Sequence, residues 1–359
     1  MSQIKIAVVG CGHLGSIHAR LLAARTDVEL VAVVDPVPES RQRVAEAYGC
    51  RALAEPQELC GVADAVVVAA PTYLHAAVSV PLLEAGLDLL IEKPIAATVA
   101  EAQSIVTVAR RHGRVVAVGH VERFNPAWQM AVERCGRVVA VESSRLAPFT
   151  FRSLDVGVVL DLMIHDIDLV LSLEPGELVS VESHGLSATG GHEDAVRARL
   201  LFSSGMIADL SASRIHPTLR RCVSLWGTQA VVAADFNAKT VEVVAASPAV
   251  ERGEFVATAV PPTDRAALKD RFFTDILPRE TLTVPEANAI ACEHDDFLAA
   301  VQSRRSALVS AAAGAAALQI AMRVLDGLVC NRLGNTAPIV SLPLHPGIGA
   351  PAFPSRKTA

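Results

Sequence analysis

The stretch Ile4-Lys5-Ile6-Ala7-Val8-Val9-Gly10-Cys11-Gly12-His13-Leu14-Gly15 decides the fold. Its first six residues form an apolar run with strand-forming character, and helical spacing follows from Leu14 to Arg25. A strand, a glycine-rich turn and a helix in this order are typical of dinucleotide-binding folds. Gly10 would allow the tight turn, Gly12 the approach of a pyrophosphate, and Gly15 the close packing of helix on strand. The phosphates would lie at the positive N-terminal end of this helix.

A second apolar run, Glu29 to Val34, ends in Asp35, twenty residues after Gly15. An acidic side chain at that position accepts hydrogen bonds from the ribose hydroxyls of NAD and repels the 2′-phosphate of NADP. The alternative is an ordinary glycine-rich turn followed by a surface aspartate, and the second strand makes it the less favoured interpretation. The sequence therefore predicts NAD in preference to NADP.

Composition and charge exclude several classes of protein. The chain has 359 residues, enough for two domains, and it is 51% hydrophobic and 19% charged, as in globular proteins. A net charge of −6 gives no general attraction to nucleic acids or acidic membranes, so we expect neither as a partner. The seven cysteines are scattered and include no CxxC pair, which predicts reduced thiols in the cytoplasm and no metal site. We also expect no signal peptide, and a packed helix rather than a membrane span at Ala311 to Leu328.

Strand and helix patterns alternate from residue 4 to residue 119. The buried strand 64–70 stops at Pro71-Thr72, where a loop facing a ligand is expected at the carboxyl edge of the sheet. The strand 87–91 leads into Glu92-Lys93-Pro94, and Pro94 is a candidate for a cis peptide bond. This alternation predicts a doubly wound parallel sheet, the Rossmann fold, as a domain over residues 1–121.

The rhythm changes after residue 121, and we expect a second, α+β domain over residues 122–330 that forms a mostly antiparallel sheet. The strand-like segments are 137–146, 178–188, 195–202, 206–214, 222–226 and 229–235. Two helices, 286–303 and 306–329, are expected to close this domain. Residues 331–359 are rich in proline, glycine and small residues, so we expect a tail or arm.

The most informative stretch of the second domain contains Asp161, His165, Asp166 and Asp168 within eight residues. On a helix, Asp161 and His165 are four residues apart and project from one face. Histidine titrates near neutrality, so it can take a hydroxyl proton while hydride leaves the same carbon. A solvated or capping role would be the preferred interpretation for a lone histidine. Because apolar residues flank this dense cluster, a buried polar site is favoured.

These features together carry a resemblance to a known family. The glycine turn, Asp35, the triplet Glu92-Lys93-Pro94 and the Asp161-xxx-His165 pattern resemble the Gfo/Idh/MocA oxidoreductases, over essentially the whole chain. The resemblance implies a Rossmann domain, a C-terminal domain with an open antiparallel sheet, and NAD(P)-dependent oxidation or reduction of a sugar or polyol hydroxyl. It also implies that Lys93 lies near the nicotinamide and that Asp161 and His165 face it from the other domain.

A narrower resemblance points to a nucleotide-sugar. Residues 119–126 and 151–159 are similar to those of family members that oxidise the 3-hydroxyl of UDP-N-acetylglucosamine ahead of an aminotransferase, in the synthesis of 2,3-diamino sugars for lipid A-type glycans. Arg123, Arg145 and Arg152 would supply guanidinium groups for the diphosphate. For any one of these arginines, a solvated or ion-paired surface role is an equal alternative.

The predicted residues fall into three sets. The catalytic set is Lys93, Asp161 and His165. The cofactor-binding set is Gly10, Gly12, His13, Leu14, Gly15, Asp35, Pro71, Thr72, Glu92 and Lys93. The substrate-binding set is His120, Arg123, Asn125, Arg152, Asp161 and His165.

Several alternatives stay open at this point. His165 is the expected proton acceptor, and Lys93 is the alternative because burial beside a cationic cofactor favours an uncharged amine. The substrate could instead be a free sugar, inositol or another small polyol. An alternative of another class is a regulatory protein that binds NAD without catalysis. We expect a homodimer or homotetramer, and the sequence does not distinguish the two.

Overall fold

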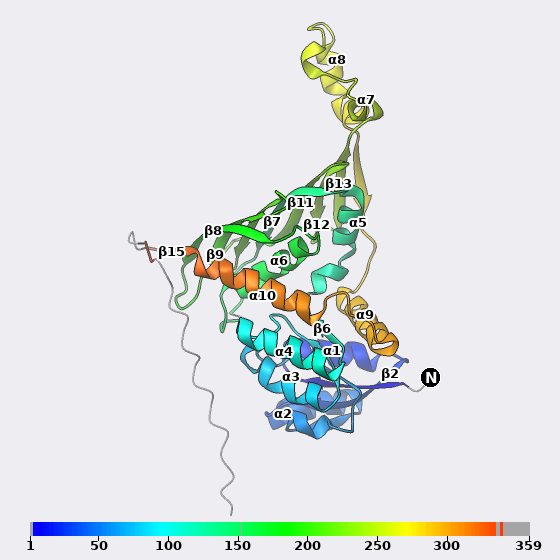
Figure 1. Cartoon of the computed structure of the whole chain (residues 1–359), viewed down its shortest axis with the longest axis vertical. Coiled ribbons are helices and arrows are strands. Elements are labelled where there is room, and N and C mark those ends of the chain that lie inside the picture. The colour runs from blue at the N-terminus through cyan, green and yellow to red at the C-terminus, as the bar shows by residue number, and fades with distance from the viewer. Residues whose placement is uncertain (1–2, 152, 335–337, 340–359) are drawn as a thin grey trace, which may run out of the picture.

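The computed structural model describes residues 3–151, 153–334 and 338–339 and contains two sheets (Figure 1). The strands of the first sheet are β1 (Ile4–Val9), β2 (Val28–Val34), β3 (Arg51–Leu53), β4 (Ala65–Val68), β5 (Asp88–Ile91) and β6 (Val116–Val118). All pairs are parallel, in the spatial order β3-β2-β1-β4-β5-β6. This order reverses between β1 and β4, and ligands of such sheets bind outside the carboxyl ends of the strands at that point. The predicted Rossmann fold is confirmed.

Helices cover both faces of this sheet, which is why β4 is buried at every residue. They are α1 (His13–Ala23), α2 (Pro38–Tyr48), α3 (His75–Glu84) and α4 (Val99–His112), with short 3₁₀ turns η1 (Pro56–Leu59), η2 (Thr72–Leu74) and η3 (Val121–Phe124). Two helices come from the far end of the chain, α9 (Ala289–Ser303) and α10 (Ala311–Asp326). The α9 residues Phe297 and Leu298 are buried in one core of this sheet, and α10 packs against α4 on the other side.

The second sheet is larger and mixed. Its strands are β7 (Val138–Leu146), β8 (Leu178–Ser187), β9 (Ala195–Phe202), β10 (Ile207–Ser213), β11 (Arg220–Gly227), β12 (Ala230–Asp235), β13 (Thr240–Ala245), β14 (Arg279–Thr283), β15 (Leu328–Arg332) and β16 (Pro338–Ile339). The spatial order is β14-β13-β12-β11-β7-β10-β9-β8-β15-β16. The pairs β7–β10 and β8–β15 are parallel and the others antiparallel, so the predicted, mostly antiparallel sheet is confirmed.

One face of the second sheet packs on helices and the other does not. The covering helices are α5 (Pro126–Cys135), α6 (Ile164–Leu171) and α10, with the π-helical turn η4 (Val159–Met163) before α6 (Figure 1). Within the described residues, no helix lies on the opposite face. Strand β9 shows the consequence, because Val196, Ala198 and Leu200 are buried while Arg197 and Arg199 are exposed.

Three differences from the sequence interpretation concern the chain after residue 239. The helix expected over 306–329 is α10, which begins later, at Ala311 after its cap Ser310, and ends at Asp326 because β15 begins at Leu328 and runs parallel to β8. Residues 331–332 complete β15 and residues 338–339 form β16, although the sequence placed both in the tail; residues 335–337 and 340–359 lie outside the described residues. The strands β13 and β14 and the segment 246–278 between them, with α7 (Pro248–Glu251), η5 (Ala257–Ala259), α8 (Arg265–Asp270) and η6 (Phe272–Ile276), were not predicted.

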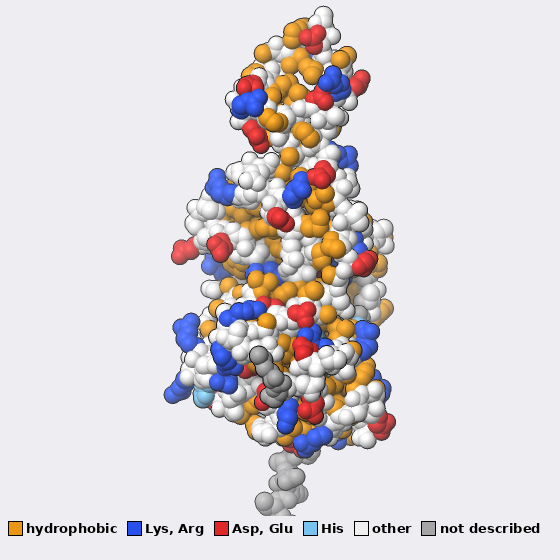
Figure 2. All heavy atoms as spheres, turned by 90° about the vertical axis from the view of Figure 1, so that its right-hand side faces the viewer, with side chains coloured by type: hydrophobic (Ala, Val, Ile, Leu, Met, Phe, Trp, Pro, Cys, Tyr) orange, Lys and Arg blue, Asp and Glu red, His pale blue; other side chains and the backbone are white. Residues whose placement is uncertain are grey.

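The segment 246–278 projects away from the sheet at the top of Figure 1. On the face in Figure 2, acidic and basic side chains are interspersed, and neither sign forms a continuous patch. None of the helices in the described part of the chain has the length and apolar character that a membrane span needs.

Candidate active site

The glycine turn fits a dinucleotide because two glycines are needed for packing and one faces open space. A Cβ at Gly10, where φ is +95°, would lie 2.5 Å from the Ala69 carbonyl oxygen, and one at Gly15 would lie 1.7 Å from the Gly10 carbonyl oxygen. Among the described residues, nothing lies within 4 Å of a Cβ at Gly12, and no side chain caps α1. The N–H groups at the start of α1 are therefore free for an anion such as a pyrophosphate.

Asp35 lies beside this turn, at the end of β2. One carboxylate oxygen accepts a hydrogen bond from the Cys11 N–H at 2.8 Å, and the other accepts one from the Val37 N–H at 2.9 Å. The remaining predicted cofactor residues lie at the same edge of the sheet. His13 and Leu14 are exposed in the first turn of α1, Pro71 and Thr72 follow β4, and Glu92 and Lys93 follow β5. The structure thus places the whole cofactor set at the carboxyl ends of β1, β2, β4 and β5.

Lys93 reaches across to the second domain. Its Nζ donates to the carbonyl oxygen of Asp161 at 2.7 Å and lies 3.2 Å from Asp161 Oδ1. The sequence predicted a regular α-helix at Asp161, but Asp161 lies in the π-helical turn η4. Such turns are rare in proteins, and those that occur are often found at functional sites. The structure therefore brings together Lys93 and Asp161, two residues of different domains that the sequence assigned to one site.

His165 follows on α6 and has a buried Nδ1 without a hydrogen-bond partner in the described part of the chain. Burial, together with the positive charges of Lys93 and Arg145, holds the pKa of His165 well below 6.5. The imidazole is therefore neutral at physiological pH. The ring of His120 lies edge-on to it, with 6.0 Å between ring centroids. Neither ring nitrogen of the buried His120 has a partner among the described residues, and burial lowers its pKa.

Behind Lys93, Glu92 is backed by two buried histidines. His18 Nε2 lies 2.9 Å from Glu92 Oε1, and His18 Nδ1 lies 2.8 Å from His294 Nε2. Burial alone would raise the pKa of Glu92, but the hydrogen bond and charge of His18 and the charge of Lys93 outweigh it and lower that pKa. The sequence interpretation missed this series of hydrogen bonds because His18 and His294 are 276 residues apart.

A third histidine holds the same loop. His75 Nδ1 lies 2.8 Å from the Pro94 carbonyl oxygen, and His75 Nε2 lies 2.8 Å from the Ala70 carbonyl oxygen. The Lys93–Pro94 peptide bond is cis, as predicted. The sequence gave His75 no functional role, and its only signal was its place four residues after Pro71, at the start of α3. The loop that carries Lys93 is thus fixed from α1, α3 and α9.

The predicted arginine cluster is only partly available to a substrate. Arg145 is 4% exposed, and its guanidinium pairs with Glu122 at 2.7 Å and Asp166 at 2.8 Å. The interpretation of Arg145 as a phosphate ligand is therefore wrong, because a buried guanidinium needs these carboxylates. Arg123 pairs with Asp168 at 2.7 Å.

The other predicted substrate residues have mixed outcomes. The Asn125 side chain accepts from the Ala127 N–H at 3.0 Å and donates to Glu122 at 2.9 Å, so it caps α5. Arg152 lies outside the described residues. In the ranges that the structure describes, no group of three or more His, Cys, Asp and Glu side chains could hold a metal ion.

Two family models match the chain. One is described as the oxidoreductase family with an NAD-binding Rossmann fold and matches residues 4–120; the other is the GFO/IDH/MocA C-terminal domain and matches residues 130–233. The chain is 32% identical over 329 residues to the UDP-N-acetylglucosamine 3-dehydrogenase of Acidithiobacillus ferrooxidans, covering 90% of this chain and 98% of that one. It is 29% identical over 235 residues to the scyllo-inositol 2-dehydrogenase (NAD(+)) of Bacillus subtilis, covering 60% and 68%.

A solved structure agrees with these matches. That of the A. ferrooxidans UDP-N-acetylglucosamine 3-dehydrogenase superposes with a TM-score of 0.79 at 31% identity, over 91% of this chain and 98% of that one. The fold, the NAD-binding domain and the oxidoreductase class predicted from the sequence are confirmed.

Proposed function

The chain belongs to the Gfo/Idh/MocA family of oxidoreductases, and on that premise we propose that it oxidises the 3-hydroxyl of UDP-N-acetylglucosamine to a ketone with NAD. The observation that carries this proposal is the 32% identity to a UDP-N-acetylglucosamine 3-dehydrogenase, which extends over 98% of that relative. The inositol dehydrogenases match a shorter part of the chain, 60% in the case of the B. subtilis enzyme.

In this proposal the neutral imidazole of His165 accepts the proton of the substrate hydroxyl. Its lowered pKa means that the ring is uncharged at neutral pH, as a base must be before it takes a proton. The hydrogen on the same carbon leaves as hydride, so one C–H and one O–H bond break and one C=O bond forms. NAD supplies the hydride acceptor when it is bound.

Lys93 polarises the same hydroxyl oxygen in this scheme. A cation beside an oxygen that is losing its proton stabilises the developing negative charge. Asp161 holds the Lys93 ammonium through two oxygens, at 2.7 and 3.2 Å, and so fixes it between the two domains. The free N–H groups at the start of α1 and the carboxylate of Asp35 would hold the pyrophosphate and ribose of the cofactor.

The test is incubation of the protein with NAD⁺ and UDP-N-acetylglucosamine, with absorbance of the reduced nicotinamide as the readout. An aminotransferase that consumes the ketone is added in a second series to draw the reaction forward. NAD reduction by inositol or a free sugar alone would favour the second candidate, which the inositol dehydrogenase match supports. NAD binding without reduction by any sugar would overturn the enzymatic proposal.

The pH dependence separates the two candidate bases. With His165 as the base, kcat/KM stays level around neutral pH and falls only in acid, where this low-pKa imidazole becomes protonated. A rate that climbs through the alkaline range, where amines lose their protons, would instead assign the base role to Lys93.

We further propose roles for the two domains, an oligomeric state and a cellular location. Residues 1–121 would serve the cofactor, and residues 122–330 the substrate and the contacts between subunits. The uncovered face of the second sheet supports a homodimer or homotetramer, because an exposed sheet face is a ready surface for a second copy. A cytoplasmic location and a downstream aminotransferase complete the proposal, and sedimentation of the purified protein tests its oligomeric part.

A further inference from the structure

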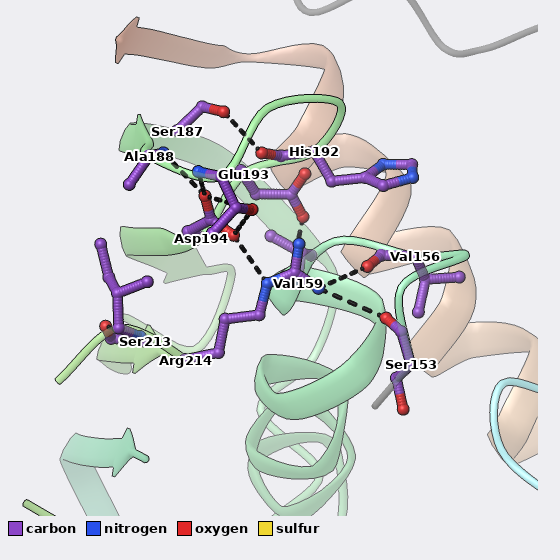
Figure 3. Close-up of polar contacts among 12 residues, drawn as sticks. Ser153, Val156, Val159, Ser187, Ala188, His192, Glu193, Asp194, Ser213 and Arg214 are labelled. Atoms are coloured by element: carbon purple, nitrogen blue, oxygen red, sulfur yellow. Dashed lines mark hydrogen bonds and ion pairs between the residues drawn. The ribbon is translucent and has the colours of Figure 1, made fainter. Parts of the chain in front are cut away.

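The helical segment that carries Asp161 and His165 is capped from another part of the chain (Figure 3). No side chain of its own caps its first turn within the described residues. Instead, the Val158 N–H donates to the Glu193 carbonyl oxygen at 3.1 Å, and the Val159 N–H donates to Glu193 Oε1 at 3.0 Å. One residue at the β8–β9 corner thus satisfies two of the N–H groups that a helix start leaves free, and its carboxylate complements the positive end of the helix.

The fit between Glu193 and the start of this segment is close. Glu193 is 4% exposed, and its carboxylate lies against Gly157, the residue just before the helix. A Cβ at Gly157 would lie 2.0 Å from Glu193 Oε1, so any side chain there would displace the carboxylate. The glycine is therefore required by a neighbour and not by its own backbone angles.

The next residue, Asp194, holds the segment that precedes the helix. Its carboxylate accepts from Arg214 Nε at 2.7 Å and from two backbone N–H groups of the β8–β9 corner, also at 2.7 Å. Arg214 in turn donates to the carbonyl oxygens of Val156 at 2.9 Å and Ser153 at 3.3 Å (Figure 3). The segment that Arg214 holds runs over residues 147–157, of which the structure describes all but Arg152, from the end of β7 to the helix start.

The 147–157 segment needs this support. Phe151 and Ser153 have φ of +55° and +49°, a conformation that residues other than glycine adopt rarely. The Phe151 side chain is 80% exposed, so its own packing does little to hold it. The Arg214 guanidinium also lies 5.6 Å from the centre of the Phe149 ring.

We propose that Glu193 and Arg214 are positioning residues, Glu193 for the segment that carries Asp161 and His165, and Arg214 for the 147–157 segment beside the sugar nucleotide. This inference rests on the proposed function, since it assigns the segment to that substrate. Neither residue is placed at the reacting atoms. Glu193 acts through the start of η4, and Arg214 acts through two backbone carbonyl groups.

The first test compares E193A, E193Q and G157A. Displacement of the helix start moves the base relative to the hydroxyl, and misplacement by 1 Å costs about 100-fold in rate. We expect kcat to fall about 10- to 100-fold in E193A and in G157A, with the Kd for NAD unchanged. E193Q keeps an acceptor for the Val159 N–H, so it should retain most of the activity. Wild-type kcat in both E193A and G157A would overturn this role for Glu193.

The second test compares R214M with R199M. Arg199 is also paired with an aspartate, Asp209, but its side chain is 60% exposed on β9 and far less buried than Arg214. We expect R214M to raise the KM for UDP-N-acetylglucosamine about 10-fold, with a smaller change in kcat, and R199M to behave as wild type. Equal effects of the two substitutions on KM would refute the role of Arg214.

A readout without substrate keeps this inference separate from the proposed function. In the NAD-loaded protein, hydrogen exchange at the amides of residues 147–163 should become faster in E193A, G157A and R214M, while exchange in the N-terminal domain stays unchanged. Failure of the wild type to oxidise the sugar nucleotide would count against the proposed function alone. Unchanged exchange in all three variants would overturn the positioning roles, whatever the substrate.

Discussion

Lys93 and His165 come from different domains, and the groups behind them differ in kind. Behind Lys93 stands a hydrogen-bonded chain of Glu92, His18 and His294. Behind His165 stands the ion-paired guanidinium of Arg145. We call Glu92, His18 and His294 the lysine wall, and Arg145 with its partners Glu122 and Asp166 the histidine wall. The lysine wall places a carboxylate beside the ammonium, whereas the histidine wall places a positive charge behind the imidazole. The positive charge behind the imidazole favours its neutral form, which is the form that the proposed base role of His165 requires.

The largest expected effect comes from removing His165, the proposed base, which lies in front of the histidine wall. We expect H165A to lower kcat about 1,000-fold, because general base catalysis contributes roughly 100- to 10,000-fold. The Kd for NAD should stay as in the wild type, since the cofactor residues belong to the lysine side. The measurements are steady-state kinetics and a fluorescence titration with NADH. The exposed His112, at the end of α4, provides the control H112A. Equal losses in turnover and in cofactor binding would contradict the division of labour between the walls.

The second effect tests the ion pairs that hold Arg145 behind His165. R145M leaves Glu122 and Asp166 buried without their partner, and such a break costs about 3–5 kcal/mol in the free energy of unfolding. Urea denaturation measures it. The triple variant E122Q/R145M/D166N removes the charges together and should recover much of the loss. An R145M protein as stable as the wild type would show that the ion pairs are not what holds this wall.

The third effect sharpens the account of the lysine wall. Burial lowers the pKa of His294 to about 3, against an ordinary value near 6.5. Below pH 6.5 the unfolded chain binds a proton at this residue that the folded protein does not, so stability falls as the pH falls. Between pH 7 and pH 5 the loss amounts to about 2 kcal/mol.

The variant H294Q lacks this titration, so its stability should decline less between pH 7 and pH 5 than that of the wild type. Thermal or urea unfolding at the two pH values gives the comparison. Identical pH dependence of the two proteins would mean that His294 has the same pKa in the folded and the unfolded state.

The smallest effect calibrates the others, because it touches neither wall. Thr98 caps α4 by accepting from the Glu101 N–H at 3.2 Å, and Glu101 accepts from the Thr98 N–H at 3.0 Å. T98A should cost about 1 kcal/mol of stability and leave kcat unchanged. A fall in kcat of T98A would show that activity follows global stability, and the comparison of the walls would then lose its meaning.

The predicted cofactor residues, at the carboxyl edge of the first sheet, could be found from the sequence because their roles depend on residues close to them in the chain. The turn at Gly10 and Gly15 needs glycine for steric reasons, and the position of Asp35 follows from the length of one βαβ unit. Lys93 and His165 could be predicted because each stands in a short sequence motif, Glu92-Lys93-Pro94 for the lysine and Asp161-xxx-His165 for the histidine. The sequence therefore contained the candidate reacting groups and the Rossmann sheet whose edge carries Lys93.

The supporting residues could not be predicted, because their partners are distant in sequence. His18 contacts Glu92 and His294, and Glu193 contacts Val159, each through the packing of separate elements. Arg145 shows the same limit in reverse. Its charge was visible in the sequence, but the two buried carboxylates that take up that charge were not.

The return of α9 to the first sheet has a consequence for how the protein is made. Phe297 and Leu298 lie in the core between α9 and the Rossmann strands, and the Val118 N–H of β6 donates to the Val309 carbonyl oxygen at 2.9 Å. The nucleotide-binding half therefore stays incomplete during translation until nearly the whole polypeptide has left the ribosome. A gene fragment ending at residue 121 would leave that apolar surface open to water, and we expect its product to aggregate.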